Sequence, residues 1–371
     1  MTKLVTFPTW NFFLTVAFIA CFSCSKREDP PVPPLPTRTV VVYMVADNSL
    51  DFMVDHDVNE LEHAWNDKFD GNMTVYIDRR GKTPYILKIQ ADKSSKVVSP
   101  QIKTYAEQNS CSPEVMAKVV ADIKSLCPAQ SYGMIFWSHA SGWLPGTSAV
   151  TRAFGEDGDY DMEISDLAKL PGKYDFFIFD ACNMANVEVA YELRRNADYI
   201  VASVMEVLAD GFPYDKVLEQ LFKPQADLVE FAKGFMAYYR AYNPASGTIS
   251  VVDARKFDEL AEVSASLTRK YANRIAGLDV SQIQPYDIEE YFFDFGDYVA
   301  ALSGNDPGLE TFRRVLSEAV VFEDHTSEVF TQSGTIEVAR SSGLSCHIPQ
   351  RIPALDSYYR RTSWYKRVYG E

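Results

Sequence analysis

The sequence predicts an α/β fold with a mostly parallel central sheet that helices cover on both faces. Apolar runs rich in β-branched and aromatic residues alternate with helical segments along residues 39–275, and this is the pattern of a parallel sheet buried between helices. The chain has 371 residues, of which 47% are hydrophobic. It is therefore long enough and apolar enough to bury the large core that such a fold needs.

The apolar runs mark the expected strands, which lie at 39–47, 73–78, 132–139, 174–181, 198–203 and 247–253. Helices are expected at 49–66, 113–126, 184–195, 226–242 and 254–275. Beyond about residue 254 the pattern becomes helix-rich and less regular. We therefore expect a core at 38–253 and a helix-rich C-terminal subdomain at 254–371 that completes the fold.

The charge of the chain bears on its partners. With 36 basic and 51 acidic residues the formal net charge is -15, which argues against a nucleic-acid partner, because such a surface needs clustered Lys and Arg. An acidic protein can attract basic peptides, although net charge alone concerns mainly solubility.

The N-terminal segment 1–24 has the pattern of a signal peptide. Lys3 precedes an apolar run at 12–22, which is too short for a permanent membrane span and fits a signal-peptide core. Ser23-Cys24 then resembles the lipobox of bacterial lipoproteins, so we expect lipidation at Cys24. Cys21, after Ala20, is the alternative lipid site, and a simple cleaved secretion signal is the second alternative.

Residues 25–37 form the expected tether. The stretch "DPPVPPLP" within it favours an extended polyproline II spacer, which holds a folded domain away from its anchor. We therefore expect an extracytoplasmic protein of the cell envelope, anchored to a membrane by lipid on the outer-membrane or periplasmic side.

The remaining cysteines are expected to be unpaired. A chain of this size does not need disulfides for stability, and the cysteines have no close metal-ligand spacing. Cys111 and Cys127 flank the expected helix 113–126, which separates their α-carbons by roughly 20 Å and so exceeds disulfide reach.

Cys182 and His139 each follow a predicted buried strand. In an open parallel sheet, reactive residues gather at the carboxyl ends of the strands, so these side chains meet if their strands are neighbours. A helix start after Cys182 would lower the pKa of its thiol, and a cysteine beside a histidine is a nucleophile with its base. The alternatives are a small buried cysteine and a structural histidine.

Two motifs carry a resemblance to a known family. "SHASGW" (138–143) is followed by "DACNMANVEVAYEL" (180–193), then by "YIVAS" and "DGFPY". Together they resemble the clostripain family of cysteine peptidases, peptidase family C11 of the caspase-like clan. The resemblance runs from "VVYMVADNSLD" (41–51) to "SGLSCHIP" (342–349). It implies a caspase-like αβα sandwich and a cysteine endopeptidase with Cys182 as nucleophile and His139 as general acid and base.

The resemblance also implies roles for neighbouring residues. The backbone N–H groups of Cys182 and Ala140 would form the oxyanion hole, with Ala140 where the family usually has glycine. Clostripain-like enzymes cleave after Arg or Lys, and the matching acids of the S1 pocket are Asp180 and Asp210. A helix cap for Asp180 and an ordinary turn acid for Asp210 are the alternatives.

Self-cleavage is expected in the segment between the two catalytic residues, as the family's maturation implies. Arg152, followed by Ala153, is the single basic residue of "LPGTSAVTRAFGEDG", a segment rich in small and turn residues that should be exposed. The protein would then be a monomer or a self-cleaved two-chain form. A plain surface loop is the alternative.

No cofactor is expected, with calcium left open. The acidic segment 155–163 lacks the ligand spacing of an EF-hand, so a solvated loop is the simpler interpretation. Asp47 and Asn48 fit the role of a helix cap. His347 and Cys346 are adjacent on an expected strand, so their side chains should point to opposite faces of the sheet. The expected substrates are polypeptides with a basic P1 residue. The alternative function is an inactive caspase-like surface lipoprotein that acts as a binding module.

Overall fold

Within the residues that the computed structural model describes, which are 1–6, 34–145 and 153–370, the central sheet has the strand order β12-β10-β9-β8-β5-β1-β2-β3-β4. Its central strands run parallel: β9 (Ala197–Ala202), β8 (Tyr174–Asp180), β5 (Ser131–Trp137), β1 (Arg38–Ala46) and β2 (Gly71–Arg79). Antiparallel strands extend both edges: β10 (Thr248–Asp253), β12 (Val320–His325), β3 (Tyr85–Lys88) and β4 (Gln101–Thr104). The predicted α/β fold with a mostly parallel sheet is confirmed.

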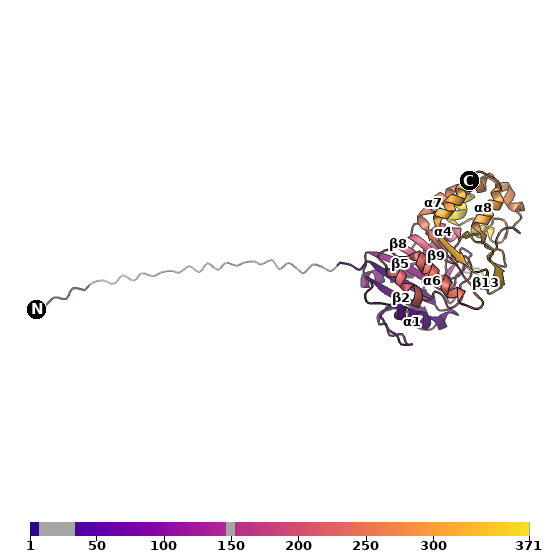
Figure 1. The fold of residues 1–371 in the computed structure, drawn as a ribbon. Helices are drawn as coiled ribbons and strands as arrows, with labels where there is room; N and C mark the ends of the chain where they lie inside the picture. The colour runs from indigo at the N-terminus through magenta and orange to yellow at the C-terminus, as the bar shows by residue number, and fades with distance from the viewer. Residues whose placement is uncertain (7–33, 146–152, 371) are drawn as a thin grey trace. The chain divides into compact units, whose positions relative to one another are not determined.

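The strands bury both faces of the sheet. In β1, Val40, Val42 and Met44 pack into one core layer with α1 (Val54–Ala64) and α6 (Leu228–Arg240). Val41, Tyr43 and Val45 pack into the other layer with α2 (Pro113–Leu126), because successive strand residues point to opposite faces. The result is a three-layer αβα arrangement, in which Figure 1 shows the strands between helices.

Helices of the C-terminal half enlarge the layer that contains α2. They are α4 (Val187–Leu193), α7 (Phe257–Lys270), α8 (Phe295–Ser303) and α9 (Gly308–Ala319), and α4, α7 and α8 lie together near the C-terminus (Figure 1). The unit Leu35–Glu371 is continuous in its contacts, and Met1–Pro34 is a separate unit. Because β12 pairs with β10, residues beyond 254 also contribute to the central sheet. The expected boundary at 253 stays a prediction.

Capping residues explain where two helices begin. The Ser112 side chain accepts a hydrogen bond from the Val115 N–H at 3.4 Å, and Pro113 occupies the first turn, which is a favourable helix start. The Asn186 side chain accepts from the Val189 N–H at 2.9 Å. Helix α4 therefore begins at Val187, three residues after the start that we expected.

Shorter elements surround this framework. The short strands are β6 (Phe154–Asp157), β7 (Tyr160–Met162), β11 (Phe293–Asp294), β13 (Glu328–Thr331), β14 (Gly334–Glu337) and β15 (Ser345–Cys346). The short helices are η1 (Asp51–Met53), α3 (Ile164–Leu167), α5 (Tyr214–Val217), η2 (Leu218–Phe222), η3 (Ala254–Lys256), η4 (Ala272–Gly277), α10 (Asp356–Tyr359) and α11 (Ser363–Val368). Strands β13 and β14 pair as an antiparallel hairpin, which reaches the functional site.

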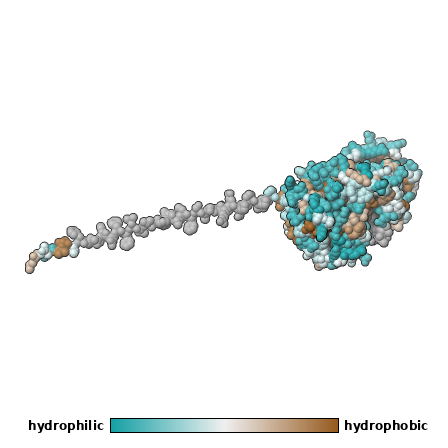
Figure 2. Space-filling view, turned by 60° about the horizontal axis from the view of Figure 1, so that its bottom comes forward, coloured by the Kyte–Doolittle hydropathy of each residue, from teal (hydrophilic) through white to brown (hydrophobic). Residues whose placement is uncertain are grey.

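The surface of the folded unit is mostly hydrophilic, and its cysteines are unpaired. Figure 2 shows a face of the folded unit on which hydrophilic residues predominate and apolar residues are scattered. Cys111, Cys127, Cys182 and Cys346 are all free thiols, as we predicted.

In the described part of the chain, helices long and apolar enough to cross a bilayer are absent.

Candidate active site

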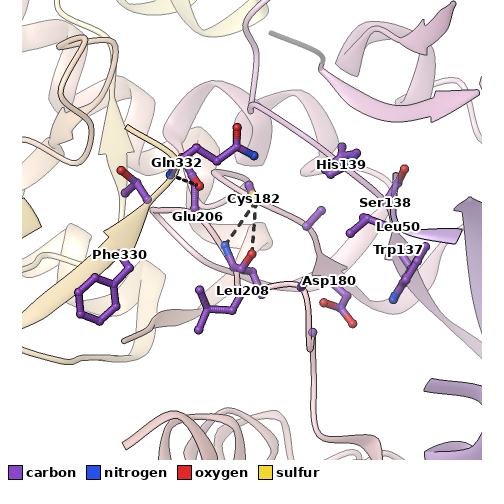
Figure 3. Close-up of a pocket in the computed structure, with 15 residues that line it drawn as sticks. Leu50, Trp137, Ser138, His139, Asp180, Cys182, Glu206, Leu208, Phe330 and Gln332 are labelled. Carbon is purple, nitrogen blue, oxygen red and sulfur yellow. Dashed lines mark hydrogen bonds between the residues drawn. The ribbon is translucent and has the colours of Figure 1, made fainter. Parts of the chain in front are cut away.

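The two predicted catalytic residues lie at one edge of the sheet. Strands β5 and β8 are parallel neighbours, with Trp137 opposite Asp180, so the predicted adjacency is confirmed. His139 and Cys182 are each the second residue after their strand, and both line a pocket of about 310 Å³. Figure 3 shows their side chains on neighbouring parts of its wall.

The Cys182 thiol contacts the backbone of Val207. Its sulfur accepts a hydrogen bond from the Val207 N–H at 3.4 Å, and the S–H donates to the Val207 carbonyl oxygen at 3.7 Å (Figure 3). Burial raises the pKa of this thiol to about 12, because desolvation disfavours the thiolate. Our expectation of a lowered pKa was wrong for this state, since α4 begins only at Val187.

His139 is held by contacts on its ring and its backbone. Its Nε2 lies 2.7 Å from the Ser49 hydroxyl oxygen, and its carbonyl oxygen accepts from the Gly155 N–H at 2.9 Å. The following Gly142 has φ +67°, and a Cβ there would lie 2.4 Å from the Asn186 side chain. Glycine therefore lets the histidine loop approach the segment between Cys182 and α4.

Asp180 supplies a buried carboxylate to the pocket wall. One of its oxygens accepts from the Tyr214 hydroxyl at 2.7 Å and from the Phe212 N–H at 3.1 Å. Burial raises the pKa of this carboxyl to about 6, and the two hydrogen bonds oppose the rise. A Cβ at Gly211 would lie 2.8 Å from the carboxylate, so glycine makes room for it. Because Asn186 caps α4, Asp180 is not its helix cap.

Asp210 lies beside the pocket but does not line it. Its neighbours Ala209 and Gly211 belong to the wall, whereas its own carboxylate accepts a hydrogen bond from the Tyr242 hydroxyl. The structure therefore brings Asp180 together with the two predicted catalytic residues, and it directs the Asp210 carboxylate towards the end of α6.

Further acids lie behind the pocket, and sequence reasoning missed them. Asp57 on α1 is fully buried and accepts from the indole N–H of Trp137 at 2.6 Å. Burial and the nearby Asp180 raise the pKa of Asp57 to about 9. Glu60 on the same helix accepts from the Tyr214 N–H at 3.0 Å. No motif marked these residues, since their proximity depends on how α1 packs against the sheet.

The β13–β14 hairpin supplies the far wall through Phe330, Thr331 and Gln332. The Gln332 N–H donates to the Glu206 carboxylate at 2.9 Å, as Figure 3 shows. Glu206 precedes Val207, so one short segment contacts both the hairpin and the Cys182 thiol. The hairpin comes from far along the chain, and sequence reasoning did not find it.

The cleavage segment lies partly outside the described residues. Arg152 is not described, whereas Ala153 is fully buried and Phe154 forms a bridge with Ala140. Our expectation of an exposed segment was therefore wrong on the Ala153 side, because the chain there packs against the histidine loop. Cleavage after Arg152 stays a prediction.

The remaining residues that the sequence singled out lie outside the pocket wall or outside the described part of the chain. The Asn48 side chain accepts from the Leu50 N–H at 2.8 Å, and His347 packs between aromatic rings, where burial lowers its pKa to about 4. The acidic segment 155–163 includes the β6–β7 hairpin, and the expectation of a protein without a cofactor, with calcium left open, stays a prediction. Cys21 and Cys24 lie outside the described residues.

A cysteine and a histidine that share one pocket at the carboxyl edge of a parallel sheet, with a buried acid beside them, define the site of a cysteine peptidase. Comparison with known proteins identifies the family. The model of the clostripain family matches residues 42–359, so the chain belongs to this family.

Individual relatives agree with that assignment. An inactive zymogen C11 protease from Parabacteroides distasonis is 32% identical, with a TM-score of 0.79 over 91% of this chain and 99% of that one. A secreted C11 cysteine protease from Bacteroides thetaiotaomicron, in complex with an irreversible peptide inhibitor, is 30% identical, with a TM-score of 0.77 over 90% and 98%. Clostripain from Hathewaya histolytica is 28% identical over 49% of this chain, and the match spans 42% of clostripain's own length.

Proposed function

We propose that this protein is a cysteine endopeptidase that cleaves peptide bonds after Arg or Lys. The observation that carries the proposal is the Asp180 carboxylate in the wall of the pocket that Cys182 and His139 also line. A buried carboxylate favours a basic side chain through a charge-assisted hydrogen bond. We accordingly assign Asp180 as the acid of the S1 pocket. Asp210 would contribute to this pocket only if its carboxylate exchanged the hydrogen bond from Tyr242 for one from the substrate.

The chemistry follows from the two catalytic side chains. The Cys182 thiolate attacks the peptide carbonyl carbon and forms a carbon–sulfur bond, and His139 protonates the leaving amine as the carbon–nitrogen bond breaks. Water then hydrolyses the acyl-enzyme with His139 as base. The backbone N–H groups of Cys182 and Ala140 are the proposed donors to the oxyanion.

The described state is a resting one in this proposal. The thiol interacts with Val207 and has a high pKa, so it must rotate towards His139 before it can react. A substrate backbone that occupies the space along Glu206 and Val207 would displace the thiol from this contact. Proton transfer to His139 would then generate the thiolate within the dyad.

Self-processing at Arg152-Ala153 is part of the proposal. The related C11 protease structure from Parabacteroides distasonis is that of an inactive zymogen, which supports maturation by cleavage in this family. Ala153 is buried here, so the chain around the bond must open locally before it can enter a cleft as an extended strand. We accordingly expect slow self-cleavage.

Anchoring at the cell envelope is the proposed location. It rests on the apolar run at 12–22, Cys24 and the proline-rich segment 25–37. A single lipid chain anchors weakly, whereas the several acyl chains of a bacterial lipoprotein hold a protein stably. The enzyme would then act on polypeptides outside the cytoplasm.

One observation favours a second function, that of an inactive binding module. The contact of the half-buried Cys182 with Val207 and the raised pKa of its thiol favour the protonated, less nucleophilic form in this state. A chain that never leaves this state would present the same pocket as a binding site for basic peptides.

Profiling the cleavage of a mixed peptide library separates the two functions. The full-length protein in detergent should cut after Arg and Lys, and Cys182→Ala should leave the library intact. Cleavage after other residues would contradict the specificity, and a library left intact by the processed wild-type protein would favour the binding module.

A further inference from the structure

A second cluster of polar side chains lies on α1, where Asp57 accepts a hydrogen bond from Trp137 of the pocket wall. In the described part of the chain, His56, Asp57 and Glu60 each offer a potential metal-ligand atom, and these atoms lie within 4.8 Å of one another. His56 and Glu60 are one helical turn apart, so their side chains meet on one face of the helix. The cluster combines one imidazole with two carboxylates.

The spacing of two of these atoms suits a metal ion. The distance between His56 Nε2 and Glu60 Oε1 is 3.5 Å. Zinc binds imidazole nitrogen and carboxylate oxygen at about 2.0–2.2 Å in tetrahedral geometry, which places two ligand atoms about 3.4 Å apart. The pair therefore already has the separation that a tetrahedral zinc ion requires.

Asp57 provides an independent observation. Its side chain is fully buried, and while Oδ2 accepts from Trp137 at 2.6 Å, Oδ1 has no hydrogen-bond partner among the described residues. A buried carboxylate oxygen without a partner costs free energy. A cation at the cluster would compensate for that cost.

We propose that His56, Asp57 and Glu60 bind one divalent transition-metal ion of the zinc type, with water as the fourth ligand. The imidazole favours zinc over calcium and magnesium, which prefer all-oxygen sites. Three protein ligands and a water molecule form a recognised zinc arrangement. This site is distinct from the acidic segment 155–163.

The cluster is connected to the wall of the catalytic pocket. Glu60 directs Oε1 towards His56 and Oε2 towards the Tyr214 N–H, so a metal on Oε1 leaves the second bond intact. The Tyr214 hydroxyl in turn donates to Asp180. A bound ion would thereby hold Glu60 and Tyr214 in place, and Tyr214 in turn would orient the Asp180 carboxylate. Outer-shell hydrogen bonds orient side chains in the same way in other metal sites.

Zinc binding can be measured without relying on peptidase activity. The parent is the full-length Cys182→Ala protein in detergent, because this change removes a competing thiol, and zinc chloride is titrated by isothermal calorimetry. His56→Ala is compared with His63→Ala. His63 lies on the same helix, but its ring bonds to the Ser94 carbonyl oxygen, so it is a matched imidazole outside the cluster.

His56→Ala should lose one zinc equivalent or weaken its affinity by at least about tenfold, and His63→Ala should match the parent. Glu60→Gln, which retains an oxygen for the Tyr214 N–H, should weaken zinc binding as His56→Ala does. Unchanged zinc binding in His56→Ala would overturn the proposal. Equal losses in His56→Ala and His63→Ala would also overturn it, because they would indicate non-specific binding to imidazoles. These outcomes are independent of whether the library is cleaved.

Discussion

The sulfur of Cys182 lies 3.4 Å from the backbone nitrogen of Val207, although His139 lines the same pocket. The predicted nucleophile therefore rests against the segment that follows β9, where the half-buried thiol has a raised pKa. Because the thiolate is the reactive form, we expect this thiol to react more slowly than one that is paired with a histidine.

Alkylation of Cys182 should report this state. Because the pKa of the thiol is raised to about 12, the reactive thiolate is scarce at neutral pH and its fraction should grow roughly tenfold per pH unit up to that value. The iodoacetamide rate at Cys182 in the uncleaved protein, followed by peptide mass spectrometry, should rise without a plateau to at least about pH 10. Glutathione in the same tube should level off earlier. A plateau for Cys182 near pH 7 would show that the thiolate is already paired with a histidine.

Asp180→Asn should reduce the selection for basic residues. The substitution retains an oxygen for the Tyr214 and Phe212 donors and removes the charge, which should lower kcat/KM for an Arg peptide by about 10- to 100-fold. A matched peptide with citrulline at P1 should lose much less, because its side chain is neutral. Similar losses on both peptides, together with slower alkylation of Cys182, would mean that Asp180 supports the fold of the site and does not bind the substrate.

Self-processing should depend on Arg152 and on the nucleophile. We expect purified wild-type protein to be cut at the Arg152-Ala153 bond into two fragments that stay associated. Cys182→Ala and Arg152→Ala should each remain a single chain. Lys169→Ala is the matched control, because Lys169 is an exposed basic residue between the same two catalytic residues, and this variant should be cut like the wild type. Intact-mass analysis that finds fully active, uncut wild-type protein would refute activation by cleavage.

Lipid attachment should require Cys24. Metabolic labelling with a fatty-acid analogue should mark the wild-type protein and Cys21→Ala, and Cys24→Ala should lose the label. Label that persists in Cys24→Ala and disappears in Cys21→Ala would move the anchor to the upstream cysteine. Absence of label in all three proteins would indicate a simple cleaved signal.

The central part of the fold could be predicted from the sequence because its strands are buried on both faces. Runs such as 39–47 and 174–181 are nearly continuous in apolar residues, which is the pattern of central parallel strands. The edge strands β4 and β12 were missed, since both are short and no residue of either is fully buried. Edge strands carry little hydrophobic signal.

The shared pocket of Cys182 and His139 could be predicted from the sequence, but the present position of the thiol could not. Cys182 and His139 line one pocket because β5 and β8 are neighbours, and two strand-end motifs were sufficient to suggest it. The contact between Cys182 and Val207 depends on how the segment after β9 folds back, and the wall at Phe330 comes from a distant hairpin. Such long-range packing leaves no local pattern in the sequence.

The most direct test of the central claim is the hydrolysis of an Arg peptide by the dyad variants. Cys182→Ala and His139→Ala should each lower turnover by at least about 10³-fold, because nucleophile and base act as a unit, and circular dichroism should show that both remain folded. Cys127→Ala, which removes a buried free thiol at the end of α2, should retain activity. Turnover at the wild-type rate in a folded Cys182→Ala or His139→Ala protein would contradict the account.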